Sequence, residues 1–326
     1  MARITPWLMG GAGLLTAAAG GLALFNGLTA RKIETAFPPQ GRFIEVEGAK
    51  LHYLDVGEGP AIVMIHGLGG QMRNFTYALV DRLKERFRVI VVERPGSGYS
   101  QRAPGVSARL TVQASAIAAF IRALELDHPL VVGHSLGGAV ALALALDHRE
   151  QVGGLALIAP FTQPQSEVPP LFRGLAVPWP WLRWLVGWTV AAPAAMLHRQ
   201  ETLEVLFGPE PAPGDFATKG GSLLSLRPAS YYAASTDMMA VDQDMPALAA
   251  RYGELDLPVG VLFGTGDRIL DAAVNGQGLV GKIAGLDLEL IEDGGHMIPL
   301  TQPQRVADFV ARIAGRIGAR APVKAI

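Results

Sequence analysis

Runs of consecutive apolar residues alternate with longer segments of helical periodicity over most of the chain. Such apolar runs are typical of strands that are buried on both faces of a parallel sheet. They occupy residues 61–65, 89–92, 130–132, 155–158, 259–263 and 288–291. Helical patterns lie between them at 75–87, at 112–126 behind a Thr111 cap, at 137–148, at 272–284 and at 304–317. This alternation predicts an α/β fold, with a mostly parallel sheet flanked by helices.

A different pattern opens the folded part of the chain. Bulky and polar residues alternate over 43–47 and 50–56, with Gly48 between them. A period of two around a turn residue predicts a pair of antiparallel strands. Residues 36–41 contain two prolines and are expected to be a linker, so the folded domain begins near Arg42.

Residues 1–35 form a hydrophobic segment that carries no charge from Thr5 to Ala30. A bilayer is spanned by about 20 apolar residues, so we expect an uncleaved membrane anchor and contact with a membrane. A cleaved signal peptide is the first alternative, although residues 28–30 make a poor cleavage site. The other is a helix of a soluble protein. The side of the membrane stays open, and Arg31 and Lys32 mildly favour a cytoplasmic catalytic domain.

The strand–helix alternation stops between residues 161 and 244. This stretch has no strand-like run, is rich in proline and holds tryptophans at 179, 181, 184 and 188. An insertion here would lie over the carboxyl ends of the strands, where open α/β sheets bind ligands. We therefore expect a helical cap at 161–244, inserted into a catalytic domain made of residues 42–160 and 245–318.

Composition narrows the function classes. Half of the 326 residues are hydrophobic, which permits a large core, and 28 Lys and Arg residues stand against 29 Asp and Glu. The net charge of -1 provides no basic field for nucleic acid, so we expect a small-molecule ligand. Cysteine is absent, which excludes disulfides, a thiolate nucleophile and cysteine-ligated metals. The oligomeric state stays open.

The motif Gly133-His134-Ser135-Leu136-Gly137 follows one apolar run and opens a helical pattern. A serine on such a sharp strand-to-helix turn is a nucleophile elbow, and small residues on both sides let the chain make the turn. The alternative is a serine in an ordinary turn. The backbone N–H of Leu136 lacks an intrahelical partner, so we expect it to donate to a substrate oxyanion.

The loop His66-Gly67-Leu68-Gly69-Gly70 follows another buried run. Glycines on both sides of Leu68 let the backbone approach a ligand, so Leu68 N–H is the expected second donor to the oxyanion.

A general base and an acid should come from loops at other strand ends. Of the seven histidines, His296 follows the run at 288–291 and is preceded by two glycines. Asp267 ends the stretch Phe263-Gly264-Thr265-Gly266-Asp267 and is the preferred acid. Asp271 is expected near a helix start, and Asp237, Asp242 and Asp244 are weaker rivals. The order serine, aspartate, histidine is the one that the α/β-hydrolase fold imposes.

With these motifs, residues 43–317 resemble α/β-hydrolases of the capped esterase, C–C hydrolase and haloperoxidase-like group. The resemblance includes Arg94-Pro95-Gly96-Ser97-Gly98-Tyr99-Ser100, a loop expected to give structural support. Relatives commonly have Asp before this loop, where this chain has Glu93. Epoxide hydrolases and haloalkane dehalogenases of this fold carry Asp at the elbow, so Ser135 argues against both chemistries and implies an acyl-enzyme.

The predicted function is a serine carboxylesterase that hydrolyses small hydrophobic esters and requires no metal or cofactor. Candidate pocket residues are Trp181, Trp184, Trp188 and Met297. Packing within the cap is the alternative role for the tryptophans. Within the same chemistry, the rivals are a C–C bond hydrolase and a perhydrolase. A catalytically silent binding protein is the rival from another class.

Overall fold

The computed structural model describes residues 6–165 and 167–317, and of residues 6–15 only the helical backbone. A nine-stranded sheet has the order β1-β2-β4-β3-β6-β7-β8-β9, with β5 paired to β2. The strands are β1 (Arg42–Val46), β2 (Ala49–Val56), β3 (Ala61–Ile65), β4 (Arg88–Val92), β5 (Gln101–Arg102), β6 (Leu130–His134), β7 (Gly154–Ile158), β8 (Val259–Gly264) and β9 (Asp287–Ile291). From β4 to β9 every neighbour is parallel, which confirms the predicted fold class.

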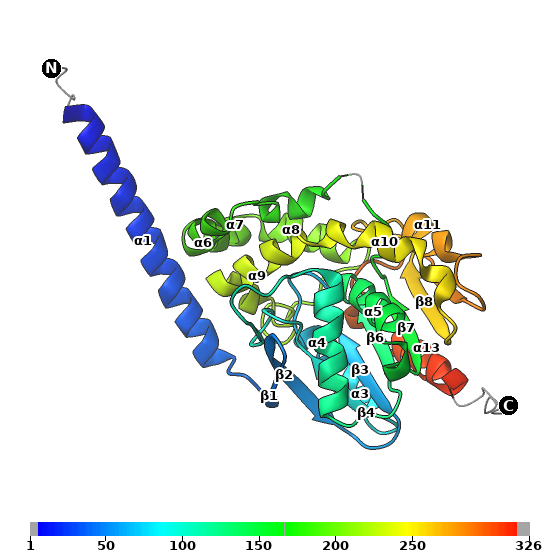
Figure 1. Cartoon of the computed structure of the whole chain (residues 1–326). Coiled ribbons are helices and arrows are strands. Elements are labelled where there is room, and N and C mark those ends of the chain that lie inside the picture. Colours follow the sequence, from blue (N-terminus) through cyan, green and yellow to red (C-terminus); the bar gives the residue numbers. More distant parts are fainter. Residues whose placement is uncertain (1–5, 166, 318–326) are drawn as a thin grey trace.

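Helices cover both faces of this sheet (Figure 1). The α-helices are α1 (Pro6–Ala36), α2 (Arg73–Thr76), α3 (Leu79–Leu83), α4 (Leu110–Ala123), α5 (Leu136–Asp147), α6 (Pro180–Trp188), α7 (Ala191–Leu197), α8 (Arg199–Phe207), α9 (Pro228–Met238), α10 (Met245–Ala250), α11 (Ala272–Asn275), α12 (Ile298–Thr301) and α13 (Pro303–Ile317). Short 3-10 helices are η1 (Arg149–Gln151), η2 (Pro170–Leu175), η3 (Ser222–Leu226), η4 (Val241–Gln243), η5 (Tyr252–Glu254) and η6 (Gln277–Leu279).

The apolar runs are buried because each strand feeds two cores. On β3, Val63 and Ile65 pack with α4 and α5, whereas Ile62 and Met64 pack with α3 and α13. Successive side chains of a strand point to opposite faces, so a strand covered on both sides needs apolar residues at every position. The antiparallel pair β1–β2, predicted around Gly48, is also confirmed.

Three helix predictions are corrected. The helix expected at 75–87 is interrupted at Ala78, whose φ of −154° is not helical. The helix expected at 272–284 ends at Asn275, before a series of glycines that lower helix propensity. Thr111 is not an N-cap: α4 begins at Leu110, and the carboxylate of Asp244 accepts hydrogen bonds from Thr111 N and Oγ1, both at 3.2 Å.

The helices between β7 and β8 lie together at one edge of the sheet, at the top of Figure 1. We refer to residues 161–244 as the cap segment. It contains α6 to α9 and no strand within its described residues, as the sequence pattern indicates. That it forms a separate domain remains a prediction.

Helix α1 lies against the cap segment through its C-terminal part, and its N-terminal part projects beyond the body (Figure 1). Nδ2 of Asn26 donates to the carbonyl oxygens of Trp188 and Thr189 at 2.8 and 2.7 Å. Among the residues that the structure describes, no helix combines the length and apolar character needed to cross a bilayer. The predicted anchor is therefore unsupported.

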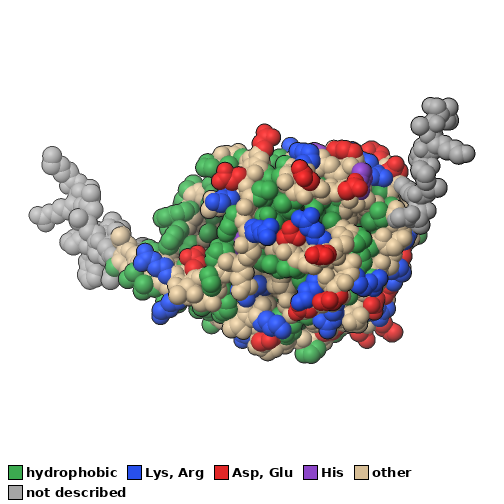
Figure 2. Space-filling view, turned by 90° about the horizontal axis from the view of Figure 1, so that it is seen from below, with side chains coloured by type: hydrophobic (Ala, Val, Ile, Leu, Met, Phe, Trp, Pro, Cys, Tyr) green, Lys and Arg blue, Asp and Glu red, His purple; other side chains and the backbone are tan. Residues whose placement is uncertain are grey.

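On the face drawn in Figure 2, acidic and basic side chains are interspersed.

A close approach of α5 to the sheet yields a stability prediction. A Cβ at Gly137 would lie 2.1 Å from the carbonyl oxygen of Ile65, whereas a Cβ at Gly315 in α13 would meet no atom within 4 Å. We expect Gly137→Ala to lower the free energy of unfolding by about 2 kcal/mol, because the backbone must shift. Gly315→Ala should leave it unchanged or raise it by up to about 1 kcal/mol. Urea unfolding measures both, and equal stability of the two variants would contradict this account.

Candidate active site

Ser135 joins β6 to α5 in a strained backbone conformation. Its φ is 54° and its ψ is −123°, a region that residues with a Cβ rarely adopt. Backbone hydrogen bonds hold the turn: Ser135 N donates to Ile158 O at 3.1 Å, and Ser135 O accepts from Gly138 N at 2.8 Å and Phe161 N at 3.0 Å. The strain is thus maintained by the adjacent strand and the start of the cap segment, and it exposes the serine hydroxyl at the strand end.

Glycine is required where other chain segments cross this turn. A Cβ at Gly133 would lie 2.6 Å from Gly137 O, and a Cβ at Gly67 would lie 2.9 Å from the Cβ of Ser135. A Cβ atom does not approach another heavy atom this closely, so neither position accepts a side chain without a backbone shift. The loop after β3 therefore lies directly against the serine, as expected for a loop that would provide Leu68 N–H.

The structure joins the candidate base and acid. Nδ1 of His296 lies 2.6 Å from Oδ2 of Asp267, and both side chains are almost fully buried. The other carboxylate oxygen accepts from the N–H groups of Ile269 and Leu270 at 2.8 and 3.0 Å. With both oxygens engaged, the carboxylate is held in one orientation and directs the imidazole ring. Asp271, as expected, caps α11.

His134 connects this pair to the elbow. Its Nε2 donates to the carbonyl oxygen of His296 at 3.0 Å, and the two imidazole rings lie 5.0 Å apart between centroids. In the described chain, Ser135 Oγ and His296 form no direct hydrogen bond with each other. Catalytic hydrogen bonds are often long without substrate and tighten in the complex. Ser135 follows His134 in the chain, and His134 hydrogen-bonds to His296. His134 therefore connects the candidate nucleophile to the candidate base.

The loop after β3 is held by Arg94, a fully buried side chain. Its guanidinium donates to the carbonyl oxygens of His66 and Gly67 at 3.0 and 2.9 Å. It also binds Oδ2 of Asp237 at 2.6 Å, so this rival for the catalytic acid is engaged elsewhere. The expected supporting loop thus reaches both the candidate oxyanion loop and α9 of the cap segment.

Neighbouring residues accommodate Glu93, which stands where relatives commonly have Asp. Its carboxylate is buried and accepts from Tyr99 N at 2.6 Å and His52 Nδ1 at 2.8 Å. A Cβ at Gly98 would lie 2.1 Å from Cδ of Glu93, so glycine provides the space for the longer side chain.

A cavity of about 120 Å³ opens beside Ser135. Leu68 and Leu136 share it with the serine, so both predicted N–H donors belong to residues that line it. The other lining residues are mostly apolar: Phe161, Gln165, Glu167, Val168, Pro169, Phe172, Met238, Val241, Asp242, Ile269 and Leu270. Most of these lining residues belong to the cap segment. They form no recognisable sequence motif, so no pattern in the sequence indicated them.

The four candidate pocket residues do not line this cavity. Trp181 and Trp184 are 65% and 59% exposed on the outside of α6. Trp188 lies beside α1, 3.5 Å from where a Cβ of Gly27 would be, and Met297 packs with Phe207 and Leu300. A substrate contact of these four residues therefore stays a prediction, and the contacts of Trp188 and Met297 agree with packing within the protein.

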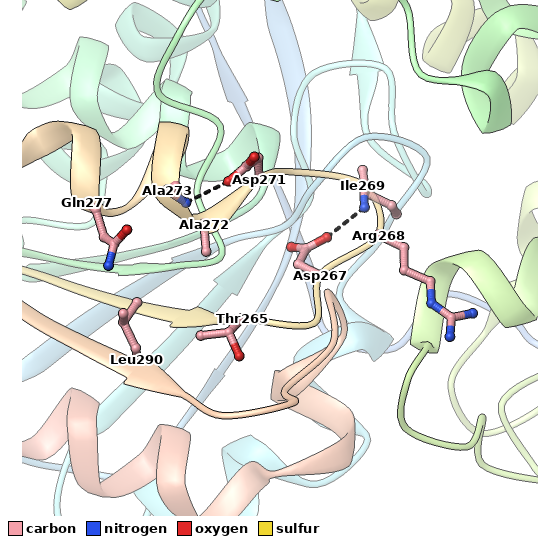
Figure 3. A pocket seen from close by; sticks show the side chains of 9 residues that line it. All are labelled: Thr265, Asp267, Arg268, Ile269, Asp271, Ala272, Ala273, Gln277 and Leu290. Atoms are coloured by element: carbon pink, nitrogen blue, oxygen red, sulfur yellow. Dashed lines mark hydrogen bonds between the residues drawn. The ribbon is translucent and has the colours of Figure 1, made fainter.

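A second cavity, of about 520 Å³, lies behind the acid (Figure 3). Its lining includes Thr265, Asp267 and Asp271 but neither Ser135 nor His296. Ile269 lines both cavities. Asp267 thus borders this second cavity, whereas the cavity beside Ser135 is lined by neither Asp267 nor His296.

Two buried histidines generate a pH prediction. Burial lowers the pKa of His134 from 6.5 to about 3, and burial together with the charge of Arg94 lowers the pKa of His66 well below 6.5. The unfolded chain binds these protons more readily than the folded chain. The contribution of the two neutral histidines to the free energy of unfolding is therefore complete above about pH 6.5 and falls as the pH drops toward 3. His134→Gln keeps a donor for His296 O, so we expect a shallower loss, by up to about 1.4 kcal/mol per pH unit. Urea unfolding between pH 4 and 7 measures this, and parallel curves would contradict it.

Comparisons with known proteins agree with this fold. The profile of the Alpha/beta hydrolase family matches residues 62–309. Haloalkane dehalogenase 2 of Mycobacterium tuberculosis is 30% identical over 122 residues, which are 37% of this chain and 42% of that protein. The 2-hydroxy-6-oxo-6-phenylhexa-2,4-dienoate hydrolase of Comamonas testosteroni is 33% identical over 113 residues, or 34% and 40% of the two chains. The match spans 42% or less of the length of each of these two curated relatives.

A solved structure has the same architecture. A thermophilic esterase from Thermogutta terrifontis superposes with a TM-score of 0.68 at 23% identity, covering 85% of this chain and 99% of that one. At this identity the likeness concerns the fold. Since the family profile extends over most of the chain, from β3 to α13, the chain belongs to the Alpha/beta hydrolase family.

Proposed function

We propose that this chain is a serine carboxylesterase that cleaves hydrophobic esters of modest size. The observation that carries the proposal is the strained Ser135, at a cavity shared with Leu68 and Leu136, beside the hydrogen-bonded pair of His296 and Asp267. Ser135 is the nucleophile, His296 the base and Asp267 the orienting acid. The cap segment is a lid over the site, and the substrate is a small molecule.

In this mechanism His296 takes the proton of Ser135 Oγ, and the oxygen attacks the carbonyl carbon of the ester. The N–H groups of Leu68 and Leu136 stabilise the oxyanion. The intermediate then expels the alcohol, which leaves with the proton from His296, and an acyl-enzyme remains. Water, deprotonated by the same imidazole, releases the carboxylic acid and restores Ser135. Asp267 stabilises the imidazolium throughout.

The identity of the elbow residue, Ser135, favours ester hydrolysis over the dehalogenation for which one relative is named. Haloalkane dehalogenases of this fold resemble this chain but carry Asp at the elbow, where this chain has Ser135. A serine oxygen forms an ester with an acyl group, which water can cleave. We therefore favour acyl transfer over dehalogenation for this chain.

The second candidate is hydrolysis of a carbon–carbon bond. The partial relative from Comamonas testosteroni is named as a hydrolase of a phenylhexadienoate, and the same three residues can serve that reaction. Turnover of a vinylogous diketone faster than p-nitrophenyl butyrate would favour this candidate, and the reverse order favours the esterase.

Ser135→Ala tests the main proposal. We expect it to lower kcat/KM on p-nitrophenyl butyrate by several orders of magnitude, because the proposed acyl-enzyme forms on the oxygen that alanine lacks. Ser115→Ala, on the outer face of α4, is the matched control and should retain activity. Labelling with a fluorophosphonate should occur in the wild type and in Ser115→Ala but not in Ser135→Ala. An unlabelled, inactive wild-type protein would instead favour a silent binding protein.

The charges in the cavity generate a specificity prediction. Glu167 and Asp242 are the charged residues among those that line the cavity beside Ser135, and burial raises the pKa of Asp242. Near pH 8 we expect esters with a carboxylate at the far end of the acyl chain to be poor substrates. Asp242→Asn should improve kcat/KM for such an ester, relative to its uncharged analogue, by about fivefold, which corresponds to removing about 1 kcal/mol of repulsion.

Asp308→Asn is the control for this change, since Asp308 is exposed on α13 and its carboxylate accepts from Gln304. It should leave the ratio of the two rates unaltered. An equal ratio in the wild type and in Asp242→Asn would show that the carboxylate does not act on bound substrate.

A further inference from the structure

The end of α8 lies directly on the two loops that carry the candidate acid and base. A Cβ at Gly295 would be 2.4 Å from the carbonyl oxygen of Phe207, and a Cβ at Gly266 would be 2.6 Å from Cδ of Pro209. Gly295 precedes His296, and Gly266 precedes Asp267. Both loops are therefore in contact with the cap segment one residue before their functional side chains.

An apolar cluster strengthens this contact. Phe207 and Phe216 of the cap segment pack with Met297 and Leu300, which follow the candidate base. Arg268, beside the acid, donates from Nη1 to Glu204 O in α8 at 3.1 Å. The cap segment thus contacts the loops on both sides of the His296–Asp267 pair.

Glu210 is the polar centre of this contact. Its Oε2 accepts from Gly295 N at 3.0 Å and from Thr301 Oγ1 at 2.7 Å. Its Oε1 accepts from Gln302 Nε2 at 2.9 Å. One carboxylate therefore joins the residue before His296 to the end of α12, and it closes the loop that contains the base.

The backbone around His296 is consequently held from two directions. His134 donates to its carbonyl oxygen from the elbow side, and Glu210 accepts from the preceding N–H on the cap side. The imidazole itself is oriented by Asp267. A base must lie within hydrogen-bond reach of the nucleophile, and small displacements lower the rate steeply.

We propose that Glu210 is a positioning residue, through which the cap segment holds the His296 loop in the geometry that proton transfer requires. The proposal rests on the proposed esterase function for its kinetic test. Glu210 acts as a hydrogen-bond acceptor rather than as a charge, because its oxygens contact the loop backbone, Thr301 and Gln302 rather than a basic side chain.

Three substitutions separate position from charge. Glu210→Gln removes the charge but keeps an oxygen for Gly295 N and Thr301, while Gln302 can turn its amide to accept from the new one. Glu210→Ala removes charge and acceptor together. Glu210→Asp keeps the charge but shortens the side chain by one methylene, which draws the oxygens away from their partners. Glu201→Ala, an exposed carboxylate in α8 paired with His198, is the control.

We measure kcat and KM on p-nitrophenyl butyrate, with rates divided by the concentration of sites titrated with fluorophosphonate. Glu210→Ala should lower kcat by 10- to 100-fold, with KM changed less than about threefold. Glu210→Gln and Glu201→Ala should stay within about threefold of the wild type, and Glu210→Asp should resemble Ala. Wild-type kcat in Glu210→Ala would overturn the proposal, as would a loss in Glu210→Gln equal to that in Ala. If Glu210→Ala does not fold, the comparison of the other two variants tests the proposal: kcat should be higher in Glu210→Gln than in Glu210→Asp, and the reverse order would overturn it.

A measurement without turnover separates this proposal from the proposed function. The downfield proton resonance of His296 Nδ1–H reports its hydrogen bond to Asp267 whether or not an ester is cleaved. It should persist in Glu210→Gln and shift or broaden in Glu210→Ala. An inactive, unlabelled wild type that shows this difference would overturn the esterase function alone. An unchanged resonance in Glu210→Ala, with wild-type kcat, would overturn the positioning role alone.

Discussion

The geometry of the site depends on one sharp turn. Ser135 has a positive φ at the end of β6, a conformation that costs on the order of 1–3 kcal/mol for a residue with a side chain. The backbone hydrogen bonds to Ile158, Gly138 and Phe161 offset this cost. The β3 loop and the first turn of α5 lie in close contact with this turn, and Gly67, Gly133 and Gly137 allow the approach because a Cβ at each would clash. The same packing puts Leu68 and Leu136 on one cavity with the serine.

The elbow also influences the loop that carries the candidate base. The side chain of His134, next to the serine, reaches His296 O, and burial keeps its pKa near 3, so its ring stays neutral over the working range of an esterase. A neutral ring beside His296 adds no positive charge that would disfavour protonation of that imidazole. His134 can therefore support the base closely without opposing the charge that the proposed reaction creates there.

Sequence patterns predicted the parts of the structure that local physics dictates. Strands covered on both faces must be apolar throughout, so the runs ending at Ile65 and Ile158 could be predicted as strands. Glycine-rich loops at strand ends indicated Asp267 and His296, which a hydrogen bond joins. The remainder depends on packing between distant segments. Asp244 caps α4 from 133 residues away, and Tyr77, next to the interruption at Ala78, donates to Asp215 of the cap segment. No periodicity encodes such contacts, so neither the cavity lining nor Glu210 could be found from the pattern.

The cap segment is attached to both halves of the candidate machinery by polar contacts. Asp237 on α9 binds Arg94, which holds the carbonyls of the loop bearing Leu68, and Glu210 binds the loop bearing His296. Lifting the cap as a rigid body would separate a buried ion pair and leave Gly295 N without its acceptor, so both loops would lose supports together. Glu167 and Asp242 border the cavity, and within the described part of the chain neither side chain hydrogen-bonds to the loop bearing Leu68 or to the loop bearing His296. Substrate entry along that side would preserve the oxyanion loop and the base loop, whereas entry by cap opening would require the site to be rebuilt on closure.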